Sequence, residues 1–119
     1  EDGESLAERF RLAHQCRTPE KSQSLVDAYA HAGTVWRGTT AIADYKAQPP
    51  SDEAARMPST MVMRGEHDFV TEACVEGWKD AFNHKFVRIK MLEGCSHHGL
   101  LENGALYGDM VDSFFAEYD

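Results

Sequence analysis

The second half of the sequence alternates two short apolar runs with two helical patterns, and this alternation restricts the fold most strongly. Residues 60–64 and 86–91 have the length and composition of strands. Residues 71–83 and 103–118 space their apolar side chains as amphipathic helices do. Strands that are joined through a helix by short connections are parallel neighbours in one sheet. The pattern therefore predicts an α/β fold with the order strand, helix, strand, helix.

Two strands do not complete a parallel sheet, because such sheets are covered on both faces and normally contain several more strands. The chain also opens at Glu1 without a methionine. We therefore expect the sequence to be the end of a larger α/β protein. A missing segment or a companion chain would supply the remaining strands.

The first half of the sequence reads as helical. Ser5 and Glu8 have the spacing of a capping box, which satisfies free amides at the start of a helix. Thr18-Pro19 predicts a second helix start, with threonine as the N-cap and proline at the first helical position. Gly33 is placed to end that helix in a left-handed conformation.

Two adjacent prolines, Pro49 and Pro50, divide the chain, because proline lacks an amide donor and interrupts helices and central strands. The sequence thus predicts a helical segment over 1–50 and an α/β segment over 51–119.

The charge balance excludes several classes of partner. The chain has 12 Lys and Arg against 20 Asp and Glu, a formal charge of −8, and no basic cluster. An acidic surface repels phosphate backbones and anionic lipids, so we expect no nucleic-acid binding. No apolar run approaches the roughly 20 residues that span a bilayer, so we expect a soluble protein without membrane insertion.

The chain has three cysteines, Cys16, Cys74 and Cys95, and this odd, sparse number does not fit a disulfide framework. It favours a reducing compartment such as the cytoplasm or an organelle interior.

Candidate catalytic residues follow the two predicted strands. Asp68 follows the first strand and His97 follows the second. The carboxyl ends of parallel strands meet at the same edge of a sheet, where ligands of open α/β sheets bind. A carboxylate beside an imidazole fixes its tautomer and leaves the other ring nitrogen free to take a proton. The sequence therefore predicts an Asp–His pair at this edge.

These loops resemble those of the α/β-hydrolases. Residues 58–68, PSTMVMRGEHD, look like the strand and acid loop, and Gly94-Cys95-Ser96-His97 followed by Glu102 looks like the histidine loop. The fuller runs GEHDFVTEAC and EGCSHHGLLEN are most similar to the proline iminopeptidase branch. The resemblance is good from residue 58 onward and weak over the first half, which would be the tail of a helical cap.

Carried over to this sequence, the resemblance implies that Asp68 is the carboxylate of a catalytic triad and His97 its general base. His98 is a rival for the base, but only His97 stands five residues before Glu102. The residues alone leave a structural interpretation open for both. Asp68 suits an Asx turn or a helix cap, and His97 suits a hydrogen bond within its loop.

Two parts of the hydrolase pattern are missing. The sequence contains no Gly-x-Ser-x-Gly, the strained turn that exposes the nucleophilic serine, so the chain alone is expected to be inactive. In the aminopeptidases of this branch, a Trp-Gly-x-x-Glu-Phe-like segment binds the substrate's α-amino group. Here residues 36–41 read WRGTTA, with Thr40 in place of the glutamate. The substrate and the residues that bind it are therefore unassigned.

Two other chemistries use the same loops. Cys95, His97 and His98 with His67 offer ligands that suit zinc, although their spacing matches no common zinc finger. Cys95 as a nucleophile would need a base on another element and a depressed pKa. We expect neither, and no cofactor.

The leading prediction is the C-terminal part of a serine α/β-hydrolase that cleaves an amide or an ester. Its partner is the rest of the hydrolase core, which carries the serine. The alternative is a non-catalytic interaction subunit derived from a hydrolase, because fold does not determine chemistry. In that case a larger assembly covers the loop that carries His97.

Overall fold

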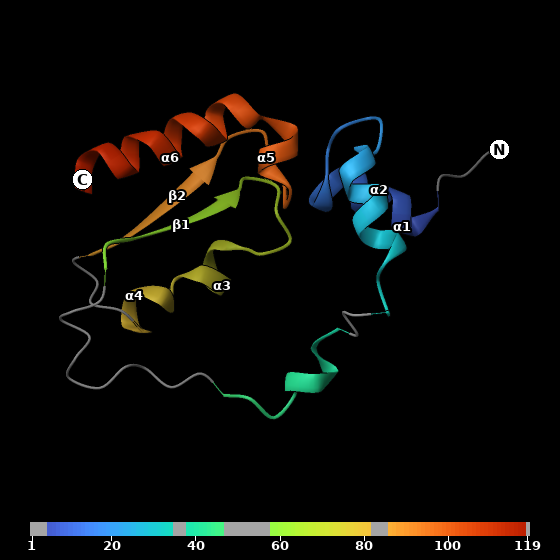
Figure 1. The fold of residues 1–119 in the computed structure, drawn as a ribbon, viewed down its shortest axis with the longest axis horizontal. Helices are drawn as coiled ribbons and strands as arrows, with labels where there is room; N and C mark the ends of the chain where they lie inside the picture. Colours follow the sequence, from blue (N-terminus) through green and yellow to red (C-terminus); the bar gives the residue numbers. More distant parts are fainter. Residues whose placement is uncertain (1–4, 35–37, 47–57, 82–85, 119) are drawn as a thin grey trace.

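The computed structural model describes residues 5–34, 38–46, 58–81 and 86–118 (Figure 1). Its first half contains α1 (Leu6–Phe10), the π-helical turn η1 (Arg11–Gln15), α2 (Gln23–Ala30) and the 3₁₀ turn η2 (Thr39–Ile42). Its second half contains β1 (Thr60–Gly65), α3 (Glu72–Val75), α4 (Trp78–Ala81), β2 (Val87–Leu92), α5 (Gly99–Glu102) and α6 (Gly104–Tyr118). None of the helices in these ranges is long and apolar enough to span a bilayer.

The two strands form the parallel pair that the sequence predicts. Thr60 lies opposite Val87 and Gly65 opposite Leu92, so the strands start and end together. In Figure 1, α6 lies on one side of the strand pair and α3 and α4 on the other. Both strands point toward α5 and the N-terminal helices. The carboxyl ends of β1 and β2 therefore face the first half of the chain.

The backbone that follows β2 lies so close to the end of β1 that position 65 has no room for a side chain. A Cβ on Gly65 would overlap the carbonyl oxygen of Ser96 and lie 2.6 Å from that of Cys95. Both obstacles are backbone atoms, which cannot rotate out of the way. Glycine is therefore required at the end of β1.

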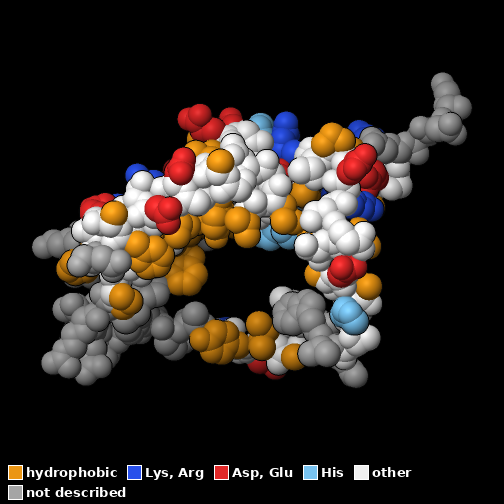
Figure 2. All heavy atoms as spheres, turned by 45° about the horizontal axis from the view of Figure 1, so that its top comes forward, with side chains coloured by type: hydrophobic (Ala, Val, Ile, Leu, Met, Phe, Trp, Pro, Cys, Tyr) orange, Lys and Arg blue, Asp and Glu red, His pale blue; other side chains and the backbone are white. Residues whose placement is uncertain are grey.

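The core of the described residues is small. The buried apolar side chains in these ranges are Cys16, Leu25, Val75, Val87, Leu92 and Cys95. The Cα radius of gyration is 17.1 Å, whereas a compact domain of this length would have about 13.5 Å. Hydrophobic side chains line the hollow in the centre of Figure 2. The fold therefore leaves much of its apolar surface uncovered.

Helix α6 shows this exposure most clearly. Asn103 caps the helix as predicted, because its Oδ1 accepts a hydrogen bond from the amide of Leu106 at 3.1 Å. The apolar stripe that predicted the helix is also present, but no residue of α6 is buried. Phe115 is 55% exposed. Leu106, Met110, Val111 and Phe114 are half-buried, so the exposed part of the stripe, Phe115 and Tyr118, is available to pack against a further element.

The N-terminal helix starts as predicted, whereas the second helix does not. Ser5 Oγ accepts from the amide of Glu8, so Ser5 is the N-cap of α1. The predicted start of the second helix at Thr18-Pro19 is wrong, since α2 begins at Gln23. The Thr18 hydroxyl donates to the carbonyl of Glu20 instead of capping a helix.

The buried side chain of Arg11 explains this departure. Its guanidinium donates to the carbonyl oxygens of Cys16 and Thr18, both at 3.1 Å. It also pairs with the carboxylate of Glu8 at 2.7 Å. Carbonyls that accept from a side chain are oriented away from a helical ladder, so residues 16–18 stay irregular. Gly33 has φ +84°, the left-handed conformation expected of it.

The helix predicted over 71–83 is interrupted. Thr71 precedes it as expected, but α3 ends at Val75 and α4 begins at Trp78. Gly77 lies in the break, where glycine weakens a helix. The predicted end near Asn83 and the dividing prolines, Pro49 and Pro50, lie outside the described residues.

The tight approach at Gly65 gives a stability prediction. Gly65→Ala should lower the free energy of unfolding by about 1–3 kcal/mol, the usual cost of overpacking. Gly108→Ala is the matched control, because Gly108 lies inside α6 with open space around its Cβ position. That control should raise the free energy of unfolding by about 0.5–1 kcal/mol. Urea unfolding measures both, and equal stability of the two variants would contradict the prediction.

Candidate active site

The site is built from two loops that hydrogen bond to each other. We call residues 66–71, after β1, the acid loop and residues 93–98, after β2, the histidine loop. The amide of Glu66 donates to the carbonyl of Leu92 at 3.0 Å, and that of His67 donates to Cys95 at 2.9 Å. Glu66 Oε2 in turn accepts from the amide of Gly94 at 2.9 Å. The backbone therefore fixes the two loops against each other.

Asp68 is held by its own loop. Its Oδ1 accepts from the amide of Val70 at 2.8 Å, which is an Asx turn. Its side chain is only 6% exposed. The Asx turn that the sequence allowed for Asp68 is therefore present, and it fixes the direction of the carboxylate.

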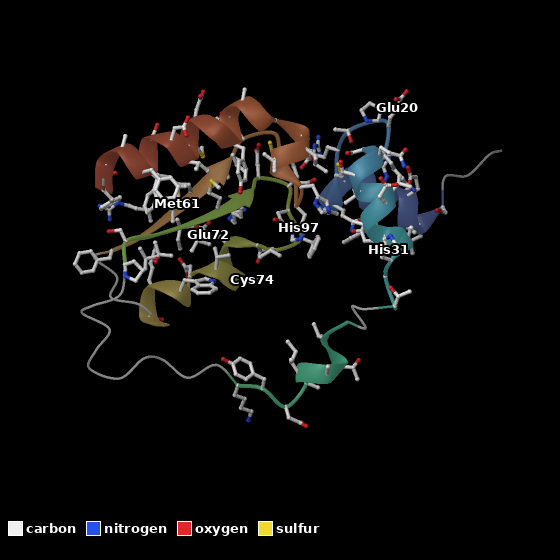
Figure 3. All side chains as sticks on the ribbon, in the orientation of Figure 1. Glu20, His31, Met61, Glu72, Cys74 and His97 are labelled. Atoms are coloured by element: carbon white, nitrogen blue, oxygen red, sulfur yellow. The ribbon has the colours of Figure 1, made fainter. Side chains whose placement is uncertain are left out.

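The same carboxylate faces His97. His97 Nδ1 lies 3.1 Å from Asp68 Oδ1 and 3.3 Å from Oδ2. A carboxylate only accepts hydrogen bonds, so in the neutral imidazole the proton is on Nδ1 and Nε2 is left as the base. The imidazole is 39% exposed and lies between the strand tips and the N-terminal helices (Figure 3). The predicted contact between these two residues is confirmed.

An aromatic stack that the sequence does not predict flanks the imidazole. The ring centroid of Phe69, the residue after Asp68, lies 4.4 Å from that of His97. Phe10 of α1 lies 5.7 Å from Phe69. Phe10 stands one helical turn before His14, and this spacing predicts only that the two side chains lie on the same face of a helix. The spacing does not show that Phe10 packs against Phe69 of the acid loop.

Glu102 fixes the histidine loop. Its carboxylate accepts from the Ser96 amide at 2.9 Å and from the Ser96 hydroxyl at 2.7 Å. It also accepts from the amide of Arg17 at 2.7 Å. Ser96 is buried, so these bonds satisfy polar groups that have lost contact with water. The spacing of Glu102 from His97, which is part of the resemblance to the hydrolase histidine loop, thus has a structural reason.

The N-terminal segment contacts both loops. His14 Nδ1 lies 2.9 Å from the carbonyl oxygen of His67 in the acid loop. In the histidine loop, the amide of His97 donates to His14 at 3.4 Å, and that of His98 donates to Gln15 at 3.0 Å. Residues far apart in the sequence are therefore joined around the candidate pair.

His98, the rival base, has a different environment. Its Nε2 is buried and has no hydrogen-bond partner among the described residues. Burial lowers the pKa of His98 below its usual value, and the neighbouring His97 lowers it further. Asp68 hydrogen bonds to His97 rather than to His98 in the described structure. The geometry therefore favours His97 as the partner of the carboxylate.

Comparison with solved structures identifies the fold. The proline iminopeptidase of Mycobacterium smegmatis matches with a TM-score of 0.66 and 22% identity, over 92% of this chain and 40% of that one. VinJ matches with a TM-score of 0.68 and 19% identity, with the same coverages. The chain has an α/β-hydrolase fold. No family model and no curated protein matches its sequence.

The chain spans 40% of the length of both solved hydrolases. That share is consistent with the C-terminal portion of the hydrolase fold, as the sequence predicts. In this partial hydrolase fold, β1 and β2 form one parallel sheet, and the acid loop and the histidine loop follow its two strands. The roles of Asp68 and His97 in a triad stay predictions, because similarity at this level of identity concerns the fold.

The structure gives no support to Cys95 as a nucleophile or to a zinc site in these two loops. Cys95 is buried, and this burial raises the pKa of its thiol, with a smaller contribution from Glu102. A thiol with a raised pKa is a poor nucleophile. In the described part of the chain, no three His, Cys, Asp or Glu side chains are grouped so that they could hold a metal ion. Thr40 lies exposed in η2, while Trp36 falls outside the described residues.

The burial of His98 predicts a pH dependence of stability. Its pKa is lower in the folded chain, so the unfolded chain binds more protons below about pH 6.5, the ordinary imidazole value. The free energy of unfolding should therefore fall as the pH drops from 7 toward 5. Besides the nearby His97, the charges of Glu102 and Asp68 act on His98 and oppose part of this shift.

Urea unfolding at several pH values tests this prediction. His98→Gln should flatten the decline, whereas His31→Gln, at an exposed position of the first half, should keep the wild-type slope. Comparison of slopes removes any constant loss of stability in the variants. A His98→Gln slope equal to the wild-type slope would contradict the assignment.

Proposed function

We propose that the chain supplies the acid and the base of a Ser-His-Asp triad to a serine hydrolase that cleaves an amide or an ester. The observation that carries this proposal is the hydrogen bond between His97 Nδ1 and Asp68 at the tips of adjacent parallel strands. The hydrolase-like fold supports it. The nucleophilic serine lies outside these residues.

The geometry suits His97 to general base catalysis. Nε2 takes the proton of the serine hydroxyl while the serine oxygen bonds to the substrate's carbonyl carbon. The imidazolium returns that proton to the leaving amine or alcohol as the carbonyl re-forms. The same nitrogen then activates water, which releases the acyl group and regenerates the serine. Asp68 stabilises the imidazolium through Nδ1 in both halves of the reaction.

The strand tips leave space for the missing nucleophile. An open hollow of about 580 Å³ lies beside the pair, lined by residues that include Met63, Gly65, Asp68, His97 and Tyr107. In this proposal the hollow receives the turn that carries the serine. Residues 51–119 then form part of the hydrolase core, and residues 1–50 form a cap-like segment over it.

The substrate is proposed only as a class. One structural neighbour is a proline iminopeptidase. Thr40 stands where the resembled aminopeptidases carry the glutamate that binds the amino group. An uncharged hydroxyl gives no ion pair with an ammonium group. We therefore propose acyl transfer from an amide or an ester without a requirement for a free amino terminus.

The uncovered apolar surface favours a second candidate, a non-catalytic interaction subunit. Leu6 is 80% exposed, and Phe115 of α6 is 55% exposed. Such surface normally packs against another chain. Both candidates need a partner, and they differ in whether that partner carries a reactive serine.

The first test uses the purified chain and a serine-directed fluorophosphonate. We expect no labelling, because the chain lacks the strained turn and the oxyanion donors that activate a serine. Intact mass spectrometry measures the adduct directly. A stoichiometric adduct on this polypeptide would show that the nucleophile lies within the chain.

The second test uses the complete protein or complex, purified under mild conditions from its native source. We expect fluorophosphonate to label a serine outside the 119 residues. His97→Ala should lower kcat about 10⁶-fold and Asp68→Asn about 10⁴-fold. His31→Ala and Asp112→Asn, at exposed positions, are the matched controls.

A partner without a reactive serine would overturn the triad proposal in favour of the interaction subunit. Wild-type kcat in the His97→Ala variant would overturn it as well.

A further inference from the structure

One short helical segment contacts both loops of the candidate site. We call residues 10–17, from the end of α1 through η1 to the loop after it, the brace. His14 of the brace contacts the carbonyl of His67, which directly precedes Asp68. The carbonyl of His14 accepts from the amide of His97. A single residue thus holds the chain beside the carboxylate and the chain of the imidazole.

We propose that the brace is a positioning element for the Asp68–His97 pair and that His14 is its main positioning residue. A catalytic role of the pair rests on the proposed function, whereas the contacts by which the brace aligns the pair do not depend on it. The two side chains come from different loops, and catalytic groups must be held within about 0.5 Å of their productive geometry. A third element bonded to both loops supplies that precision.

The chemistry of the contacts defines the state of His14. A backbone carbonyl only accepts, so His14 Nδ1 must donate to His67. Phe10 packs on the His14 ring at a centroid distance of 5.6 Å and on Phe69 at 5.7 Å. Phe69 in turn stacks on His97. The brace therefore contacts the acid loop through a hydrogen bond and through an aromatic stack that ends at the imidazole.

The brace is itself held at its far end. The amide of Arg17 donates to Glu102, the same carboxylate that orders Ser96 in the histidine loop. The buried guanidinium of Arg11 bonds to the carbonyl of Cys16 and fixes the bend that follows η1. The brace is thus fixed by Arg11 within the N-terminal segment and by Glu102 from the second half of the chain.

Three variants of the full chain test the role of His14. His14→Ala removes the donor, and His14→Asn places an amide N–H near the position of Nδ1. His31→Ala is the control, because His31 is also an exposed histidine of the N-terminal segment but contacts neither loop among the described residues. The ¹⁵N shifts of the His97 ring, measured where the imidazole is neutral, report which nitrogen carries the proton.

We expect wild type, His14→Asn and His31→Ala to show His97 protonated on Nδ1. In His14→Ala the Nδ1 resonance should move toward the average of the two tautomers, and exchange of the His97 and His98 amides should accelerate. A structural role alone would change the urea midpoint without changing the tautomer of a folded chain. Nδ1 protonation retained in His14→Ala would overturn the proposal.

A second outcome keeps the test decisive if His14→Ala does not fold. His14→Asn with a wild-type tautomer then supports the role of the donor, and loss of that tautomer in a folded His14→Asn chain overturns it. These spectra need no serine partner. Absence of a labelled serine in the native complex would therefore remove the proposed function and leave the result on the brace unaffected.

Discussion

The parallel pairing of β1 and β2 is the constraint on which the site depends. Because the strands end in register at Gly65 and Leu92, their following loops leave the sheet at the same point. The absence of a side chain at Gly65 lets the histidine loop cross directly over the end of β1. Any separation of the strands by one side chain would move Asp68 away from His97. The site is therefore a property of the sheet edge rather than of either loop.

The sequence predicts the parts of this arrangement that depend on periodicity and on short-range order. The strands, the cap at Asn103 and the contact between Asp68 and His97 follow from apolar alternation and from the topology of parallel strands. The predicted helix start at Thr18 fails because the guanidinium of Arg11 takes the local carbonyls. A local capping preference of about 1 kcal/mol is easily outweighed by several charge-assisted hydrogen bonds.

The brace could not be predicted for a related reason. Its bonds run from His14 and Gln15 to backbone groups more than fifty residues away in the sequence. Backbone amides and carbonyls are the same at every position, so such partners leave no signature in the sequence. Glu102 is the exception, because its spacing from His97 matches the resembled histidine loop. The structure adds what that carboxylate does, which is to join the loop to the brace.

Structural demands explain most of the residues around the site, but they do not explain His97. Asp68 closes an Asx turn, and Glu102 and Ser96 satisfy each other in a buried loop. The side chain of His97 is more than one-third exposed, and within the described residues it hydrogen bonds to Asp68. The Asx turn of Asp68 rests on the amide of Val70, so it does not depend on His97. The Asp68 carboxylate is buried and held in place, whereas the His97 imidazole is oriented by it and remains partly exposed to solvent. A general base that must contact a substrate needs both properties. The geometry therefore favours the catalytic proposal over a subunit that only retains the fold.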